Sequence, residues 1–221
     1  MDISAAHIAV LAENQYQELE LWYPVLRFRE EGAHVTVVGP RADQVYGSKL
    51  GYPVVPDVAV TDVSPDDFDC VIVPGGFAPE QLRRNRDMLD LVRGVSERDG
   101  IVAAICHAGW VLASAGLAKG RKLTCVSVIQ DDVKAAGAEY VDQPVVRDGN
   151  LITSRLPNDL PEFCRAIAEA LAERPARDRS AREHPTGTSA AYQAPARVKT
   201  RSAGAGSANY LMYAVSGSPG T

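Results

Sequence analysis

The sequence lacks most of the features that mark secreted, membrane-bound or nucleotide-binding proteins. Its four cysteines lie far apart and form no CxxC pair, so we expect no disulfide framework. No stretch approaches the ~20 apolar residues of a membrane span, and MDISAAHIAVLAEN has no basic segment before an apolar run. Neither GxGxxG nor GxxxxGK[ST] occurs, which argues against a nucleotide cofactor. These absences predict a cytoplasmic protein with reduced thiols, no cofactor and no membrane partner.

Positive charge is scarce in the first 175 residues, which contain 17 Lys and Arg against 26 Asp and Glu. An acidic body without a basic stripe argues against nucleic acid as a partner. The histidines have no ligand partners at suitable spacing, so we expect no metal site.

The composition changes after Arg174, where Ala, Ser, Gly, Pro, Thr and Arg begin to dominate. We therefore predict one domain over 1–175 and a low-complexity extension over 176–221, disordered or loosely docked. Within the extension, only Tyr210–Val215 is apolar enough to dock on the body or on a partner.

Short apolar runs alternate with segments of helical spacing. Continuous apolar runs are typical of parallel strands that helices cover on both faces. The alternation predicts an α/β fold with a parallel sheet between two helical layers, a three-layer sandwich. An Asp-Gly pair further along predicts a hairpin. The expected strands are 7–11, 34–38, 70–74 and 101–105, the helices 18–31, 79–98 and 158–174, and the hairpin strands 144–147 and 151–154.

Cys106 follows the apolar run 101–105 directly and precedes a histidine, small residues and a helical pattern. A strand, a nucleophile and a helix in this order are the elements of a nucleophile elbow. Free N–H groups and the helix dipole at such a turn favour negative charge, which predicts a lowered pKa for the thiol. The alternative is a buried, inert cysteine, because free cysteines are often fully buried.

Gly75 and Gly76 follow the strand 70–74 in the segment VIVPGGFAPE. Paired glycines let the backbone approach a ligand and direct an N–H group at a developing oxyanion. A plain strand-to-helix turn is the alternative. Because parallel sheets bind ligands at the carboxyl ends of their strands, we expect the two glycines to lie near Cys106.

Glu18 and Glu20 stand at the start of the first expected helix, in ELELWYP. Acids at this position are stabilised by the helix dipole, which is a sufficient explanation for both. A carboxyl that points into a cleft beside a thiolate has another use. It can be protonated, hydrogen-bond the sulfur and move a proton during turnover.

Taken together, PGGFAPE, AAICHAGW, GRKLT and IQDDVKAAGAEYVDQPVVRDGNLITSRLPNDLPEF resemble the ThiJ/PfpI superfamily in order and spacing. The resemblance covers residues 7–173 and is greatest to the PfpI-type intracellular peptidase and deglycase branch. The superfamily also contains glyoxalase III homologues and the protein DJ-one. It implies a flavodoxin-like fold, similar to class I glutamine amidotransferases, and no cofactor.

The resemblance also implies roles for individual residues. Cys106 matches the reactive cysteine, and Glu20 matches the glutamate that hydrogen-bonds the thiolate. Gly76 and His107 match the backbone N–H donors of the oxyanion hole. Glu80 matches an acid that reaches His107 of a neighbouring subunit in oligomers built from dimers, so self-association as a dimer or hexamer is implied. Because His107 is adjacent to the cysteine, we do not assume a catalytic pair from sequence order.

This chain departs from the common pattern at the elbow. Where relatives commonly read CHGP, residues 106–109 read CHAG, and Trp110 follows. We expect Gly109 to loosen the first helical turn and Trp110 to shape or cap the cleft, and we count Gly75 and Trp110 among the substrate-binding residues. Val126 replaces a frequent tyrosine, which removes a polar group beside the thiol.

Three functions fit these residues. The first is an enzyme for small reactive carbonyls such as methylglyoxal, or for their protein adducts, with Glu20 as proton shuttle. The second is a PfpI-like peptidase that uses Cys106, His107 and Glu80, with peptides or proteins as substrates. The third is a redox sensor or holdase whose Cys106 is oxidised.

Overall fold

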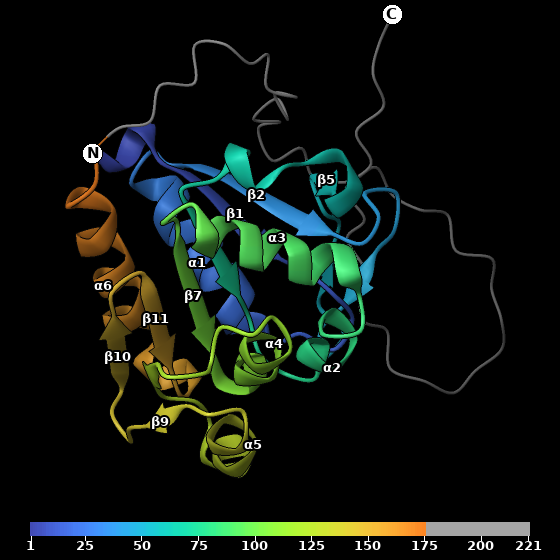
Figure 1. Ribbon diagram of the computed structural model, residues 1–221. Coiled ribbons are helices and arrows are strands. Elements are labelled where there is room, and N and C mark those ends of the chain that lie inside the picture. The colour runs from blue at the N-terminus through green and yellow to red at the C-terminus, as the bar shows by residue number, and fades with distance from the viewer. Residues whose placement is uncertain (176–221) are drawn as a thin grey trace, which may run out of the picture.

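The computed structural model describes residues 1–175, which form a seven-stranded sheet in the order β10-β11-β7-β6-β1-β2-β5 (Figure 1). All neighbouring strands pair in parallel except the edge strand β10, which is antiparallel to β11. The strands are β1 (His7–Leu11), β2 (His34–Gly39), β5 (Val58–Ala59), β6 (Cys70–Val73), β7 (Ile101–Ile105), β10 (Val145–Asp148) and β11 (Leu151–Ser154). Two small pairs lie outside it: β3 (Tyr46–Gly47) with β4 (Pro53–Val54), and β8 (Lys122–Leu123) with β9 (Glu139–Tyr140).

Helices cover both faces of the sheet. Helices α1 and α6 contact one another and strands β2 and β11, whereas α3 and α4 contact β7 from the opposite layer (Figure 1). The helices are α1 (Glu18–Glu30), α2 (Ala78–Leu82), α3 (Arg86–Glu97), α4 (Gly109–Ser114), α5 (Gln130–Ala135) and α6 (Leu160–Ala172). The predicted three-layer α/β fold is thereby confirmed.

The strand order determines where a ligand can reach the sheet. The chain builds outward from β1 to β2 and then reverses to add β6, β7 and β11 on the other side of β1. In doubly wound sheets, ligands bind at the carboxyl ends of the strands beside this reversal. The segments that follow β1, β6 and β7 carry Glu20, the Gly75-Gly76 pair and Cys106, so all three meet at that end.

Two predicted helices begin or end elsewhere. The helix expected over 79–98 is two helices, because the Asn85 side chain caps a new one and accepts hydrogen bonds from the N–H groups of Asp87 at 3.0 Å and Met88 at 3.3 Å. Helix α6 begins at Leu160, after the short 3₁₀ turn Pro157–Asp159.

The predicted hairpin is present with a tighter turn than expected. Asp148 belongs to β10, so only Gly149 and Asn150 connect the strands, and Gly149 has a φ of 58° that suits glycine. Because β10 runs antiparallel, the sheet is mixed at this edge.

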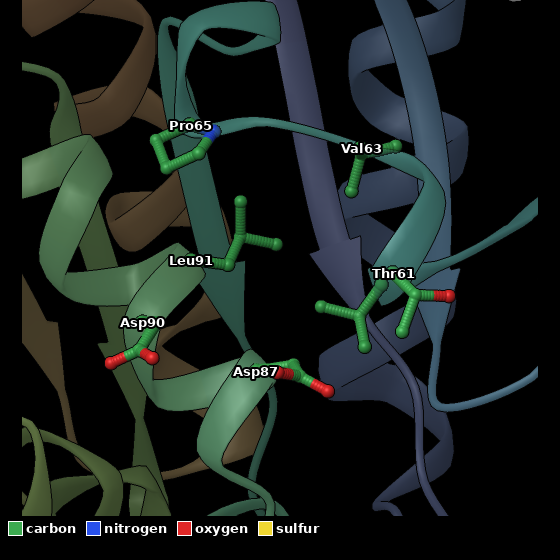
Figure 2. A pocket seen from close by; sticks show the side chains of 7 residues that line it. Thr61, Val63, Pro65, Asp87, Asp90 and Leu91 are labelled. Carbon is green, nitrogen blue, oxygen red and sulfur yellow. The ribbon is translucent and has the colours of Figure 1, made fainter.

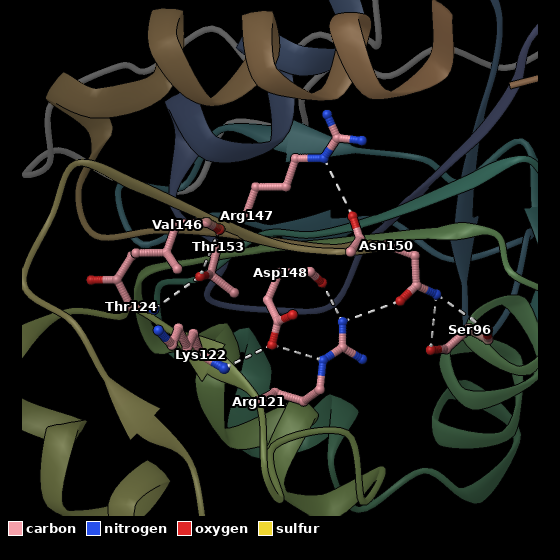
Figure 3. A network of polar contacts seen from close by, with 10 residues as sticks. Ser96, Arg121, Lys122, Thr124, Val146, Arg147, Asp148, Asn150 and Thr153 are labelled. Carbon is pink, nitrogen blue, oxygen red and sulfur yellow. Dashed lines mark hydrogen bonds and ion pairs between the residues drawn. The ribbon is translucent and has the colours of Figure 1, made fainter. Parts of the chain in front are cut away.

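A polar network fastens this hairpin to the loop before β7 (Figure 3). Arg121 Nε donates to Asp148 Oδ2 at 3.1 Å, and Arg121 Nη2 donates to Asn150 Oδ1 at 3.2 Å. Asn150 Nδ2 donates in turn to the carbonyls of Gly100 at 2.9 Å and Ser96 at 3.2 Å. The network therefore fixes the amino end of β7, the strand whose other end carries Cys106.

Among residues 1–175, no helix combines the length and apolar character needed to cross a membrane. The same residues contain no group of three or more His, Cys, Asp or Glu side chains arranged to hold a metal ion. The extension predicted over 176–221, with its apolar segment Tyr210–Val215, lies outside the described residues.

Candidate functional site

Cys106 lies at a sharp turn between a buried strand and a helix. Its φ of 61° places a non-glycine residue in the left-handed region, which costs energy and is common at functional sites. The 3₁₀ turn Cys106–Ala108 follows, and α4 starts at Gly109. The side chain is 8% exposed. This is the elbow geometry that the sequence predicted.

Glu20 lies in the first turn of α1 and is completely buried. Its Oε2 accepts a hydrogen bond of 2.8 Å from the Gly75 N–H. Gln17 fixes the start of the helix, because its side chain accepts a 2.9 Å hydrogen bond from the N–H of Glu20. The Cys106 thiol is close enough to interact with the carboxyl. The structure therefore brings together the acid and the thiol that the sequence singled out.

Both glycines of the pair are required by their surroundings. A β-carbon on Gly75 would lie 2.6 Å from Oε2 of Glu20 and 2.7 Å from Cβ of Cys106. Gly76 has a φ of 77°, and a β-carbon there would lie 2.4 Å from the carbonyl oxygen of Gln15. The same Gln15 oxygen accepts the Phe77 N–H at 2.8 Å, which fixes the loop after β6.

The N–H groups of Gly76 and His107 lie within hydrogen-bonding reach of the Cys106 sulfur, where they favour its charged form and act to lower its pKa. Two N–H groups that converge on a nucleophile can also hold the oxygen of a substrate carbonyl as it becomes negative. These are the two residues that the resemblance assigns to an oxyanion hole, and that role stays a prediction.

The prediction of a lowered pKa for the Cys106 thiol is wrong. Burial, and after it the negative charge of Glu20, raises the pKa of Cys106 to about 12, against the opposing effect of the two N–H groups. Burial also raises the pKa of Glu20 to about 7, opposed by the Gly75 N–H. Sequence reasoning missed this because it counted the helix terminus but not the loss of water around the sulfur.

The two pKa values belong to one coupled pair, because each group affects the other. Two neighbouring anions in a buried site are unfavourable, so the pair holds one proton over a wide range above about pH 7. When that proton is on Glu20, the repulsion on the sulfur is gone and the carboxyl can donate to the thiolate.

The His107 side chain lies beside the sulfur, with Nδ1 3.3 Å from Sγ. The centroid of its ring lies 5.2 Å from that of the Trp110 ring and 5.9 Å from that of the Phe77 ring. Burial lowers the pKa of His107, so the neutral ring is favoured. Trp110 is held in place by a 2.8 Å hydrogen bond from Nε1 to Asp132. Trp110 thus borders the site, as expected.

Glu80 is exposed on α2 and is not part of this cluster. Within residues 1–175, no hydrogen bond or ion pair joins it to His107, although its charge acts to raise the His107 pKa. Its expected contact with His107 of a neighbouring subunit stays a prediction.

Gly109 begins α4, and its expected loosening of the first helical turn stays a prediction. It is buried, and a β-carbon there would lie 3.0 Å from Cγ1 of Val133 and 3.1 Å from Cδ1 of Ile129. The missing side chain therefore lets α5 approach α4 closely. Val126 donates its N–H to the Cys106 carbonyl at 3.4 Å, so its backbone supports the turn.

Two residues at the edge of the site were missed by sequence reasoning. Phe77 lies within the PGGFAPE motif, which was a usable signal. Lys49 lies in an irregular loop without helical or strand periodicity, so nothing in the sequence connected it to Cys106. Its Nζ is 5.0 Å from the centroid of the Phe77 ring.

A surface hollow of about 310 Å³ lies elsewhere, between the segment after β5 and helix α3 (Figure 2). None of the predicted site residues lines it. The hollow is lined by Val60, Thr61, Val63, Pro65, Asp87, Asp90 and Leu91. It is therefore separate from the cysteine site.

Comparisons with known proteins cover the part of the chain that forms the sheet and this site. The model of the DJ-1/PfpI family matches residues 6–170. A deglycase of Thermococcus kodakarensis is 42% identical, and the deglycase PfpI of Pyrococcus furiosus is 40% identical, each over 74% of this chain and 98% of the relative. The crystal structure of DJ-1beta from Drosophila melanogaster superposes with a TM-score of 0.71 at 33% identity, over 76% of this chain and 91% of that one.

Proposed function

Because the chain belongs to the DJ-1/PfpI family, we propose that it is a cysteine-dependent enzyme of the deglycase type that acts on reactive carbonyl compounds. Cys106 is the nucleophile and Glu20 the proton shuttle. Relatives that are named deglycases support enzymatic activity in the family. The observation that carries the proposal is the buried carboxyl of Glu20, with a pKa near 7, next to two N–H donors and the thiol of Cys106, whose backbone is in the left-handed region.

The first step with an α-oxoaldehyde is addition. The sulfur attacks the aldehyde carbon, an S–C bond forms, and the electrons of the C=O double bond move to the oxygen. The N–H groups of Gly76 and His107 hold this oxygen, and the Glu20 carboxyl protonates it. The product is a hemithioacetal, and Glu20 is left as a carboxylate.

Isomerisation and hydrolysis follow without any oxidant. Glu20 removes the proton from the former aldehyde carbon and returns it to the neighbouring carbon, while the first oxygen loses its proton and the second gains one. The hemithioacetal thereby becomes a thioester of a hydroxy acid. Water then cleaves the S–C bond and releases the hydroxy acid, with the proton back on the Cys106–Glu20 pair. A carboxyl with a pKa near 7 is suited to both directions of transfer at neutral pH.

The direct test is lactate formation from methylglyoxal. We expect activity in the wild type, none above background in Cys106→Ala, and a loss of at least about a hundredfold in Glu20→Gln. Cys125→Ala is a matched control, because Cys125 is also a buried thiol but the charges that act on it are those of Asp132 and Lys134 and not that of Glu20. Equal rates for the wild type and Cys106→Ala would overturn the proposal.

A cysteine peptidase is the second candidate, and the 3.3 Å separation of His107 Nδ1 from Sγ favours it. In that reaction the His107 ring accepts the thiol proton, with Glu80 of a neighbouring subunit orienting the ring in a dimer-based assembly. The carbonyl reaction needs only the backbone N–H of His107. His107→Gln therefore separates the two: peptide hydrolysis disappears, whereas the carbonyl reaction keeps its rate within about tenfold.

A further inference from the structure

Lys49 is an exposed residue on a firmly held loop at the edge of the cysteine site. Its N–H donates to the Tyr16 carbonyl at 2.9 Å. The neighbouring Ser48 hydroxyl hydrogen-bonds Glu18, and the Leu50 N–H donates to the same carboxylate at 2.6 Å. The backbone of Lys49 is thus tied to the start of α1, the helix that carries Glu20.

A row of contacts connects the Lys49 side chain to the Cys106 sulfur. Its Nζ lies over the Phe77 ring at 5.0 Å, Phe77 is 5.9 Å from the His107 ring, and His107 is 3.3 Å from the Cys106 sulfur. Phe77 and Lys49 are both exposed. The Lys49 charge acts on His107 and Glu20, which lie beside the sulfur, so a substrate bound at Cys106 lies within the field of this ammonium group.

Of the charges that act on the pKa values of Glu20 and His107, that of Lys49 has the largest effect. None of the ion pairs within residues 1–175 includes Lys49. Its electrostatic effect on the His107 pKa exceeds that of Glu80, and its effect on the Glu20 pKa exceeds that of Glu18. The Glu18 carboxylate also accepts hydrogen bonds from the Ser48 hydroxyl and the Leu50 N–H. At both His107 and Glu20, the Lys49 cation therefore has a stronger electrostatic effect than Glu80 or Glu18.

We propose that Lys49 is a specificity-determining residue that favours α-oxoaldehydes carrying a carboxylate or phosphate group. This inference rests on the proposed function, since it names the substrate class of the same site. The anionic group lies against the Lys49 ammonium while the aldehyde carbon meets Cys106. A single exposed charge near a reacting group changes the reaction rate of an anionic substrate roughly threefold to fivefold, and less at high salt.

A pair of alkylating reagents tests the charge without requiring turnover. Iodoacetate and iodoacetamide both react by attack of the sulfur on a CH₂ carbon with loss of iodide, but only iodoacetate is an anion. The iodoacetate-to-iodoacetamide rate ratio at Cys106 cancels any change in thiolate population. We expect Lys49→Gln to lower this ratio roughly threefold to fivefold. Lys49→Arg should keep it, and added salt should reduce the difference between wild type and Lys49→Gln.

Lys119→Gln is the matched control, because it removes the same charge from an exposed lysine in the loop after α4. Its ratio should equal that of the wild type. An unchanged ratio in Lys49→Gln, or an equal fall in Lys119→Gln, would overturn the inference.

A second measurement separates this inference from the proposed function. The kcat/KM of para-carboxyphenylglyoxal relative to phenylglyoxal should fall in Lys49→Gln by a similar factor. Turnover with an unaltered preference contradicts the role of Lys49 and leaves the carbonyl reaction standing. Absence of turnover in the wild type, with a changed alkylation ratio, contradicts the carbonyl reaction and leaves the anion preference standing.

Discussion

Glu20 and Cys106 meet over Gly75: the Oε2 atom of the acid and the Cβ atom of the cysteine lie 2.6 Å and 2.7 Å from the point that a β-carbon on this glycine would occupy. The same glycine donates its N–H to that oxygen. The absence of one side chain therefore allows the acid and the thiol to share a buried space. A glycine that the sequence could assign to a turn is, in the structure, a condition for the site.

Gly75→Ala is expected to disrupt this arrangement. The added methyl group must displace Glu20 or Cys106, so alkylation of Cys106 should change at least tenfold, and lactate formation from methylglyoxal should fall at least a hundredfold. Overpacking should also lower the free energy of unfolding by about 1–3 kcal/mol, measured by urea denaturation. Gly47→Ala is the control, since a β-carbon there meets nothing within 4 Å. Matching activities in the two variants would contradict the account.

Glu20 should lower the free energy of unfolding at neutral pH, because its carboxyl is buried. Its pKa is raised in the folded protein, from 4.5 to about 7, so the folded state holds the proton more tightly than the unfolded chain. The stability that this proton provides is fully present below pH 4.5 and is lost as the pH rises through 7. The loss amounts to about 3 kcal/mol.

Glu20→Gln removes this titration and keeps an oxygen for the Gly75 N–H. We expect the variant to be more stable than the wild type at pH 8, with the difference shrinking as the pH falls toward 5 in urea denaturation. A difference that does not depend on pH would show that Glu20 has an ordinary pKa.

Cys106 should be the first of the four thiols to react. It is 8% exposed, whereas Cys70 and Cys125 are 0% and Cys164 is 2% exposed. With less than one equivalent of iodoacetamide, mass spectrometry should find Cys106 carrying most of the label, and Cys106→Ser should lose the fast phase. Oxidation by mild peroxide should also modify Cys106 before the other three thiols, which tests the redox-sensor alternative. Uniform labelling of all four thiols would argue against a reactive site.

Asn150→Ala should lower stability without altering the thiol. The substitution leaves the Gly100 carbonyl and part of the Arg121 guanidinium without their partner, at a cost of about 1–3 kcal/mol in the free energy of unfolding. Because the network lies at the far end of β7, the alkylation rate of Cys106 under native conditions should stay within twofold of the wild type. A large fall in that rate would show that the network also positions the elbow.

Much of the fold could be predicted because its strands are local apolar runs with clear boundaries. The strand Ile101–Ile105 and the cysteine after it occur where the sequence placed them. The break in the helix expected over 79–98 was missed, because the cap at Asn85 interrupts an otherwise continuous apolar spacing. The turn of the hairpin was misplaced by one residue, since the sequence does not show that Asp148 completes the last pair of the ladder.

The site was predictable as a set of residues and not as an electrostatic environment. Cys106, Glu20 and the glycine pair could be named from the motifs. Their pKa values could not, because burial depends on every element packed around them. Lys49 is separated from Cys106 by a long stretch of chain and lies in a loop, so only the folded structure brings its charge to the site.

The central claim is that Glu20 and Cys106 share one proton, and the pH dependence of Cys106 alkylation tests it most directly. In the wild type, the rate of reaction with iodoacetamide should rise through a midpoint near pH 7 and then reach a plateau that extends to about pH 10, because the pair remains singly protonated over that range. In Glu20→Gln, the midpoint near 7 should vanish, and the rate should climb steadily above pH 8. Identical profiles in the two proteins would show that the thiol ionises without the carboxyl, and the account would be wrong.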